Sequence, residues 1–324
     1  MTTAAQPTFF SRLIHLLLPT AKEPVEVVRQ AVKAGQIALG VNDNNQAVVL
    51  RDQEFADSLA LIGSYGYGQK NQAMSICAQL IASGQSVIFF DDVFDYNSFH
   101  GLNTLSRLNG RVGDFRFVPP LDDDDPKLLA LQDNPAAVAP FKLLDLKQQQ
   151  DFGCDQPVVY VASPILGHKQ DALAFDKEAM DTLDCMVRAR IGDGQRQILP
   201  LNIVLVSPKW LPDGFIERTR QAHARVIVIG SARSSAAFIE TALQVRNWMV
   251  YCGGLSAQDD DKLMTSLMRR ADPKGPMVSS TAELSRHIMG ISENQFLFSQ
   301  PGRKLEVGTG FPWRSIVEPG IDAA

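Results

Sequence analysis

Short, continuous apolar runs alternate with amphipathic stretches along most of the chain. Runs without polar alternation are typical of strands that a parallel sheet buries on both faces. The strands expected from this pattern are GQIALGV, QAVVL, SLALIG, SVIFFDD, DFRFVPP, PVVYVASPIL, LNIVLVS, RVIVIGSA and NWMVYCGG. The helices expected between them are 70–83, FHGLNTLSRLNG, DALAFDKEAMDTLDCMVRARIG, GFIERTRQAHA and 235–245. This order predicts an α/β protein with a doubly wound, mostly parallel sheet.

Both ends of the chain depart from this rhythm. We expect residues 1–35 to form a short N-terminal helical segment, in which Phe9–Leu18 is an amphipathic helix that packs on its own domain or docks on a partner or membrane. The stretch NDNN predicts a hairpin turn between the first two strands. The segment AELSRHIMGISENQFLFSQPGRKLEVG predicts a helix followed by a C-terminal β-hairpin. We therefore divide the chain into this segment, an α/β domain at 36–300, and a strand and tail at 301–324.

An acidic, proline-broken stretch at 121–142 interrupts the α/β pattern. Four successive aspartates, Asp122–Asp125, are followed by three prolines. Adjacent carboxylates without a glycine-shaped loop do not converge on one ion, so this stretch predicts an exposed connection rather than a metal site.

A glycine-rich turn follows the third expected strand. In LALIGSYGYGQKN, Gly63, Gly66 and Gly68 supply the flexible backbone with which phosphate-binding loops wrap an anion at a helix N-terminus. Such a loop needs a lysine that reaches the phosphates and then a hydroxyl that binds Mg²⁺. Gln69 and Lys70 stand at these two positions here, followed by Asn71.

The loop has three interpretations at this point. It can be an inactive phosphate loop, a working loop in which Lys70 substitutes after a local shift, or a coincidental glycine-rich turn. Asp91 and Asp92 end the next strand and are expected beside the loop. They either cap the following turn or hold a cation.

Composition limits the classes of function. The chain has 324 residues, 45% of them apolar, and a formal net charge of −5. Mixed acids and bases argue against a strongly basic nucleic-acid binder. The four cysteines have no metal-site spacing, and no apolar run is long enough to span a bilayer. These features predict a cytoplasmic protein without a resident metal.

The order of elements resembles the nucleotide-binding domain of type IV secretion and conjugation coupling proteins, within the FtsK/HerA-like ATPases. The resemblance is nearest to the IVB (Dot/Icm and IncI-plasmid) branch. It rests on IALGVNDNNQAVVLRDQEFADSLALIGSYGYGQKN, on SVIFFDDVFDYNSFHGLNTLSRLNGRVGDFRFVPP, on PVVYVASPIL and LNIVLVSPKW, and on GFIERTRQAHARVIVIGSARS. Together these segments span roughly residues 36–300. The resemblance implies a P-loop (RecA/FtsK-like) fold.

The departures from the family pattern concern its catalytic positions. The family has a lysine where this chain has Gln69. Its Walker B strand ends in two acids, where this chain has Ser207, Pro208 and Lys209. After a later strand the family usually has a polar sensor residue, a glutamine, and this chain has Ser231 at that position. The membrane helices and the helical insertion that family members usually carry have no counterpart in the sequence.

Two arginines are the remaining candidates. Arg220 and Arg225 stand near the position of a family arginine that can reach a neighbouring subunit's nucleotide. A solvated or structural role is the alternative for both.

From this resemblance we expect a catalytically inactive structural or regulatory subunit of a secretion or conjugation machine. It would act through protein–protein contacts, beside an active coupling ATPase or another component, in the cytoplasm or at the cytoplasmic face of the inner membrane. No cofactor is then needed. One alternative is an active ATPase or DNA-translocating motor that uses Lys70, Asp91 and Asp92. The other is a module that binds ATP or ADP with Mg²⁺ and does not hydrolyse it.

Overall fold

A computed structural model describes residues 23–64, 66, 68–111, 114–118, 157–163, 169–192, 200–253, 255, 261–270, 281–301 and 305–317. Phe9–Leu18 and the connection at 121–142 lie outside these residues. The strands are β1 (Ile37–Asn42), β2 (Ala47–Leu50), β3 (Leu59–Ile62), β4 (Ser86–Asp91), β5 (Phe115–Val118), β6 (Val158–Ala162), β7 (Leu201–Val206), β8 (Ala224–Gly230), β9 (Asn247–Val250), β10 (Gln295–Ser299) and β11 (Glu306–Thr309).

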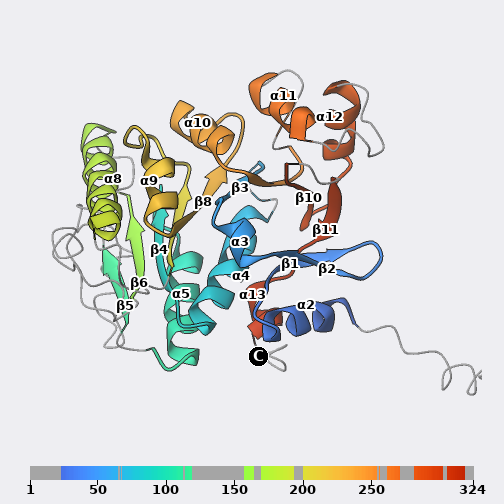
Figure 1. Cartoon of the computed structure of the whole chain (residues 1–324), viewed down its shortest axis with the longest axis horizontal. Coiled ribbons are helices and arrows are strands. Elements are labelled where there is room, and N and C mark those ends of the chain that lie inside the picture. The colour runs from blue at the N-terminus through green and yellow to red at the C-terminus, as the bar shows by residue number, and fades with distance from the viewer. Residues whose placement is uncertain are drawn as a thin grey trace, which may run out of the picture.

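Helices connect most of these strands (Figure 1). They are α2 (Pro24–Lys33), α3 (Asp52–Phe55), α4 (Gln69–Ala82), α5 (Tyr96–Leu108), α8 (Lys169–Gly192), α9 (Phe215–Gln221), α10 (Ala236–Gln244), α11 (Asp261–Arg270), α12 (Thr281–Met289) and α13 (Trp313–Val317). All strands and helices expected from the apolar pattern between 37 and 250 are present. Neither α3 nor α11 was expected.

The strands form one 11-stranded sheet in the order β2-β1-β11-β10-β9-β3-β8-β7-β4-β6-β5. The pairs from β9 to β5 are all parallel. The pairs from β9 through β10, β11 and β1 to β2 are antiparallel. The predicted doubly wound, mostly parallel sheet is confirmed. The predicted pairing of the last two strands is also present, since β10 pairs antiparallel with β11.

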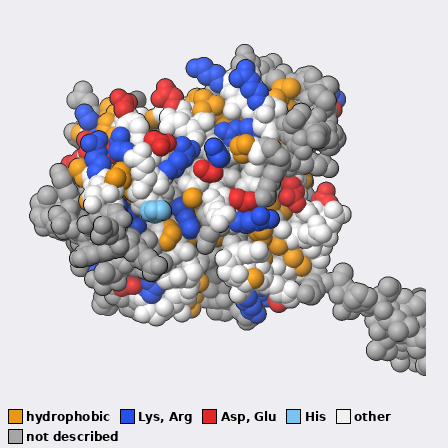
Figure 2. Space-filling view, viewed as in Figure 1, with side chains coloured by type: hydrophobic (Ala, Val, Ile, Leu, Met, Phe, Trp, Pro, Cys, Tyr) orange, Lys and Arg blue, Asp and Glu red, His pale blue; other side chains and the backbone are white. Residues whose placement is uncertain are grey.

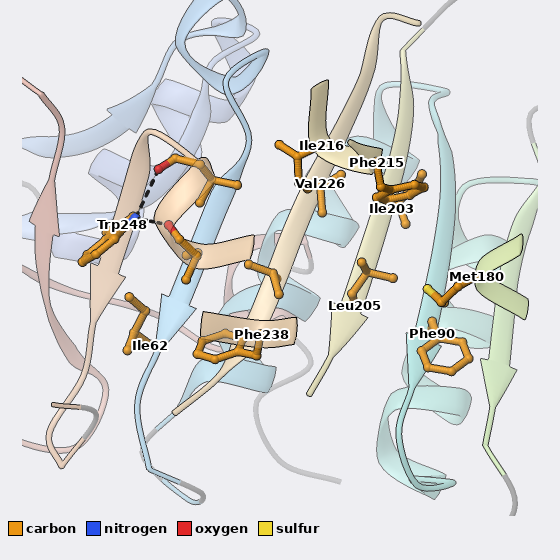
Figure 3. Close-up of a cluster of buried hydrophobic side chains, with 14 of the residues drawn as sticks. Ile62, Phe90, Met180, Ile203, Leu205, Phe215, Ile216, Val226, Phe238 and Trp248 are labelled. Atoms are coloured by element: carbon orange, nitrogen blue, oxygen red, sulfur yellow. Dashed lines mark hydrogen bonds between the residues drawn. The ribbon is translucent and has the colours of Figure 1, made fainter. Parts of the chain in front are cut away.

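Helices cover both faces of the parallel part, which explains why its strands lack polar alternation. Every residue of β4, β6, β7 and β8 is buried. One apolar core lies beneath α8–α12 and includes Phe90, Phe238 and Trp248 (Figure 3). The second core lies under α4 and α5. Figure 1 shows these two helical layers on opposite sides of the sheet. The carboxyl ends of the parallel strands therefore meet at one edge, where ligands bind in open α/β sheets.

The first and last described elements pack together. Arg29 of α2 donates a hydrogen bond of 2.7 Å to the backbone oxygen of Ser315 in α13. Val28, Val41 and Ile316 share a small apolar cluster there. The division of the chain at residues 35 and 300 remains a prediction, although β11 and α13 contact elements at the other end of the sequence.

The surface mixes charges of both signs. Figure 2 shows Lys and Arg side chains along the upper part of the face in view, with acidic side chains among them. Arg188 and Arg218 are neutralised locally, because they contact Asp184 at 2.8 and 2.7 Å. No helix within the described ranges is long and apolar enough to cross a membrane.

Candidate functional site

The glycine loop connects β3 to α4 at the carboxyl edge of the parallel sheet. Gly66 and Gly68 have φ values of 91° and 98°, a backbone region that L-residues rarely adopt. A cavity of about 160 Å³ opens at this loop. Its lining comprises Gly63, Gly66, Gly68, Gln69, Lys70, Asn71, Val206, Ser207, Ile229, Gly230 and Ser231. The structure thus brings most of the candidate residues around one cavity.

Gln69 folds back over the start of the loop. Its side-chain nitrogen lies so close to Gly63 that a Cβ added there would be 2.3 Å away, and the Cβ of Tyr251 would be 2.8 Å away. Gly63 is therefore required by close packing, in addition to any need for backbone freedom. Gln69 is only 6% exposed, and its neutral amide occupies the place of the loop's expected lysine.

Lys70 points away from the loop, toward the end of β4. Its Nζ donates to both carboxylate oxygens of Asp91, at 2.8 and 3.0 Å. A second carboxylate, that of Asp95, lies 3.8 Å from the same nitrogen. Asp91 is completely buried, whereas the Lys70 side chain is 26% exposed. The single cation of the loop is therefore held by the protein's own acids.

Burial has the largest effect on the pKa values of Asp91 and Asp92. Desolvation raises the pKa of Asp91 to about 7, although the ion pair with Lys70 acts in the opposite direction. The pKa of Asp92 is also raised by burial, against the pull of Lys70 and Lys209. The hydroxyl of Tyr160 donates to Asp91 over 3.2 Å and accepts from the backbone N–H of Asp95 over 2.8 Å.

The expected capping role of Asp91 does not match the structure. Asp95 is the N-cap of α5, and its side chain accepts from the backbone N–H of Asn97 at 3.1 Å. The side chain of Asp91 is instead engaged by Lys70 and Tyr160. The sequence predicted this helix from Phe99, whereas α5 begins at Tyr96, directly after Asp95. A buried ion pair has no local signature. Tyr160 gave no signal either, because it stands within an apolar run.

The end of β7 carries a positive charge where the family pattern has two acids. Ser207 has a φ of 43°, and its backbone N–H donates to the oxygen of Ile229 at 2.7 Å. The carbonyl of Pro208 accepts from the side chain of Ser235, the N-cap of α10. Lys209 lies 3.4 Å from Asp176 of α8, an acid that is nearly fully buried. Asp176 was missed from the sequence because its helical spacing resembles a solvated face.

The Ser231 position forms a polar turn after β8. The backbone N–H of Ser231 donates to the hydroxyl of Ser234 at 2.9 Å. The two hydroxyl oxygens lie 3.4 Å apart. Ser231 therefore adds a neutral hydroxyl to the rim of the cavity.

The two arginines lie toward the amino ends of the parallel strands, away from the glycine loop. Arg225 is at the start of β8, mostly buried, with its guanidinium 5.0 Å from the ring of Phe55. Arg220 is at the end of α9, where it contacts Glu217 at 3.2 Å and the backbone oxygen of Gln244 at 2.6 Å. Both contact their own chain, and neither lines the glycine-loop cavity. A role toward a neighbouring subunit remains a prediction.

The side chains at the loop fit a magnesium-bound triphosphate poorly. That ligand requires a lysine on the phosphates, a hydroxyl on the metal and an acid beside it. Gln69 is neutral and Lys70 is paired with Asp91. Ser207, Pro208 and Lys209, which directly follow β7, carry no carboxylate. Within the described residues, no three His, Cys, Asp or Glu side chains are arranged to hold a metal ion. The backbone of the loop has the curvature for an anion, whereas its side chains do not supply the charges.

No protein-family model and no curated protein matches the chain. Solved structures do match. The bacterial conjugative coupling protein TrwBΔN70 aligns over 90% of this chain and 91% of its own, with 9% identity and a TM-score of 0.51. The chain has the coupling-protein fold. VirB4 of Thermoanaerobacter pseudethanolicus aligns over 85% of this chain and 96% of its own, with 10% identity and a TM-score of 0.51.

A third match is the plasmid coupling protein TrwB in complex with the non-hydrolysable GTP analogue GDPNP. It covers 90% of this chain and 92% of that one, with 8% identity and a TM-score of 0.50. These likenesses confirm the P-loop fold expected from the resemblance. At such low identities they concern the fold alone, so activity depends on the residues at the site.

Proposed function

We propose that this protein is a non-hydrolysing structural or regulatory subunit of a type IV secretion or conjugation machine. The observation that carries the proposal is the buried ion pair of Lys70 with Asp91, which commits the loop's lysine to the protein itself. The coupling-protein fold supports the kind of machine. The protein would act through contacts with other components, an active coupling ATPase among them, at the cytoplasmic face of the membrane.

The number of catalytic groups that are replaced in this chain supports a protein without hydrolytic activity. Removal of one preorganised group costs roughly a hundredfold or more in rate, a few kcal/mol of barrier. Here the lysine, the metal-binding hydroxyl and both acids are replaced, at Gln69, Lys70, Ser207 and Pro208. A loop with all four replacements retains a shape for binding but lacks the groups that stabilise charge in the transition state.

Two lysines act as built-in counter-ions at this edge of the sheet. Lys70 neutralises Asp91, and Lys209 lies beside Asp176 and attracts Asp92. A buried carboxylate needs a partner charge, and these ammonium groups supply it without a metal. The fold therefore has no electrostatic need for Mg²⁺.

Magnesium should have little effect on the stability of this fold. Because Lys70 and Lys209 already neutralise the acids, excess EDTA or added MgCl₂ should change the Tm by less than about 1 °C. A ligand bound at a hundred times its Kd would stabilise the fold by roughly 2.7 kcal/mol, a shift of several degrees. Differential scanning calorimetry measures this directly. A clear loss of Tm in EDTA, restored by Mg²⁺, would contradict the metal-free assignment.

A second candidate function is nucleotide binding without hydrolysis. It is favoured by the backbone of the loop, since Gly66 and Gly68 keep the positive φ values of an anion cradle beside the cavity. In this case a nucleotide would serve as a structural ligand. The loop's backbone N–H groups would carry the binding in place of a lysine.

Calorimetric titration with Mg-ATP and Mg-ADP, with phosphate release followed on the same sample, separates these functions. We expect neither binding nor release. Saturable binding without release would support the second candidate. Release of phosphate above a buffer blank would make the protein an ATPase and overturn the proposal.

A matched pair of glycine variants shows whether any binding occurs at the loop. Gly66 and Gly84 have φ values of 91° and 79°, and an added Cβ meets open space at both. Gly66→Ala and Gly84→Ala therefore introduce similar backbone strain. Only Gly66 lines the cavity, so loss of nucleotide binding in Gly66→Ala alone would place the ligand there.

A further inference from the structure

A buried ion pair joins the start of α4 to the end of β4. Lys70 is the second residue of α4, and Asp91 is the last residue of β4. The Nζ of Lys70 donates to both carboxylate oxygens, at 2.8 and 3.0 Å, and Asp91 has no exposed surface. Lys70 also lines the glycine-loop cavity. The ionisation of one carboxylate therefore decides how tightly this cation is held away from the loop.

Acids outnumber cations around this pair. Asp91 faces Lys70 on α4, and it faces Asp92 and Asp95 on the connection that leads to α5. Lys209, which follows β7, attracts Asp92. Within the part of the chain that the structure describes, three acids at the end of β4 thus share two lysines. Neighbouring carboxylates disfavour one another's ionisation, so a proton on one of them balances the cluster without a metal.

Tyr160 of β6 gives this cluster two defined hydrogen-bond arrangements. Its hydroxyl oxygen accepts from the backbone N–H of Asp95 at 2.8 Å. Its proton has two acceptors at nearly equal distance, which are Oδ2 of Asp91 at 3.2 Å and the backbone oxygen of Asp95 at 3.3 Å. An ionised Asp91 is the stronger acceptor, whereas a protonated Asp91 can itself donate to the hydroxyl. One proton on Asp91 is therefore enough to turn the hydroxyl from one acceptor to the other.

The same proton weakens the hold on Lys70. A neutral Asp91 no longer forms an ion pair, and the carboxylate of Asp95 lies farther away, 3.8 Å from Nζ. Asp95 is committed to the start of α5, where it accepts from the backbone N–H of Asn97 at 3.1 Å and from the hydroxyl of Ser98 at 2.7 Å. The Lys70 side chain is 26% exposed. Its ammonium group can thus reach the cavity without crossing the core.

We propose that Asp91 and Lys70 form a proton-controlled switch beside the glycine loop. With Asp91 ionised, Lys70 is held against the end of β4 and Tyr160 donates to Asp91. With Asp91 protonated by solvent, Tyr160 donates to the backbone oxygen of Asp95 and Lys70 turns into the cavity. This inference rests on the proposed function, because it makes the ion pair that takes the place of nucleotide chemistry the regulated element of the subunit.

The test is a pH titration of the labelled protein by NMR. We expect the carboxyl carbon of Asp91 to titrate with a midpoint of about pH 7, because burial raises its pKa to about 7. The order parameter of the Lys70 side chain, read from its carbon-bound protons, should fall by about half below the same midpoint. A Lys70 side chain that keeps its order while Asp91 becomes protonated would overturn the proposal, as would an Asp91 that stays ionised down to pH 5.

Two glycines report where the released lysine goes. The backbone amides of Gly66 and Gly68 border the cavity and should shift with the midpoint of Asp91. Gly84 also has a positive φ but follows the other end of α4, so its amide should not shift with that midpoint. Amides of Gly66 and Gly68 that do not respond to the protonation of Asp91 would overturn the movement of Lys70 into the cavity.

Three variants identify the groups of the switch. Asp91→Asn is neutral at every pH and should give a mobile Lys70 even at pH 8. Tyr160→Phe removes a donor that favours the ionised carboxylate, and should raise the midpoint by about 0.4–1 pH unit. Asp114→Asn removes an acid that pairs with Arg111 at 3.0 Å, and should leave the midpoint unchanged. If Asp91→Asn does not fold, the titration of the unaltered protein still decides. A held Lys70 in folded Asp91→Asn contradicts the switch.

The failure of this inference is distinguishable from the failure of the proposed function. Phosphate release from Mg-ATP is measured on the same sample at pH 6 and pH 8. We expect none at either pH, and release at either one refutes the non-hydrolysing subunit. A Lys70 side chain that is held equally at both pH values, without phosphate release, refutes only the switch.

Discussion

Lys70→Met is expected to lower the free energy of unfolding by roughly 3–5 kcal/mol at pH 8, the cost of leaving a buried acid without its partner. The Nζ of Lys70 lies 2.8 Å from Asp91, and Asp91 has no exposed surface. Methionine keeps most of the side-chain volume, so the loss reports the charge rather than a cavity. Urea denaturation monitored by circular dichroism measures the change.

The same loss should depend on pH in a defined direction. The pKa of Asp91 is raised from 3.8 to about 7 in the folded protein, so the folded state binds this proton more tightly than the unfolded state. This group's contribution to stability therefore declines as pH rises from about 4 to about 7. Without Lys70 the folded pKa rises further. At pH 5, where Asp91 is protonated in both proteins, the destabilisation should be smaller by up to about 1.4 kcal/mol, because the folded pKa of about 7 lies about one unit below pH 8.

Two control variants separate the loss of the ion pair from other effects of Lys70→Met. Lys70→Met combined with Asp91→Asn removes both charges and should recover most of the loss at pH 8. Lys33→Met changes an exposed lysine of α2 and should stay within about 0.5 kcal/mol. A destabilisation by Lys70→Met that is equal at pH 5 and pH 8 would show that the ion pair is not its cause.

Trp248→Ala should destabilise the fold by roughly 3–5 kcal/mol, because it removes the largest fully buried side chain of the described core. The indole of Trp248 packs in β9 between the sheet and α10, and its N–H donates to the backbone oxygens of Ala242 at 2.9 Å and Val245 at 3.2 Å (Figure 3). The guanidinium of Arg270 lies 4.0 Å from its ring centre. Loss of the indole therefore affects the sheet and α11 together. The midpoint of urea unfolding measures the effect.

A graded series separates the parts of this effect. Trp248→Phe keeps an aromatic ring but loses the N–H donor, and should cost about 1–2 kcal/mol. A double-mutant cycle with Arg270→Ala should give a coupling of about 0.5–2 kcal/mol for the cation–π contact. Equal destabilisation by Trp248→Phe and Trp248→Ala would show that packing of the ring contributes little.

The central sheet was predictable because its strands are short apolar runs, and their local preference for the strand conformation agrees with their place in the fold. LNIVLV and ARVIVIG are buried along their whole lengths, which only a sheet covered on both faces explains. The helix α11 was not expected, although Leu263, Met264 and Leu267 stand at helical spacing in DKLMTSLMRR and form its buried face. The insertion of β11 between β1 and β10 could not be predicted, because no local pattern encodes pairing between distant segments.

The residues around the glycine loop were predictable from motif position, but their contacts were not. Motif spacing placed Gln69 and Lys70 at the loop, and both line the cavity. The direction of each side chain was unknown: Gln69 turns toward Gly63, and Lys70 turns toward Asp91. These directions are decided by a buried acid on β4 and by close packing in three dimensions, which sequence spacing does not record.

The position of β11 in the sheet has a consequence for how the protein is made. β1 and β2 reach the other strands through β11, and the contact between Asn42 and Glu306 joins residues 264 positions apart. A ribosome adds about 5–20 residues per second, so the first hairpin waits roughly 10–50 s for its partner strand. During that interval the side of β1 that later pairs with β11 exposes unpaired backbone N–H and C=O groups, which can pair with other chains. The first hairpin to leave the ribosome should thus be the last part of the sheet to become protected from hydrogen exchange, and it should be the segment most dependent on chaperones during synthesis.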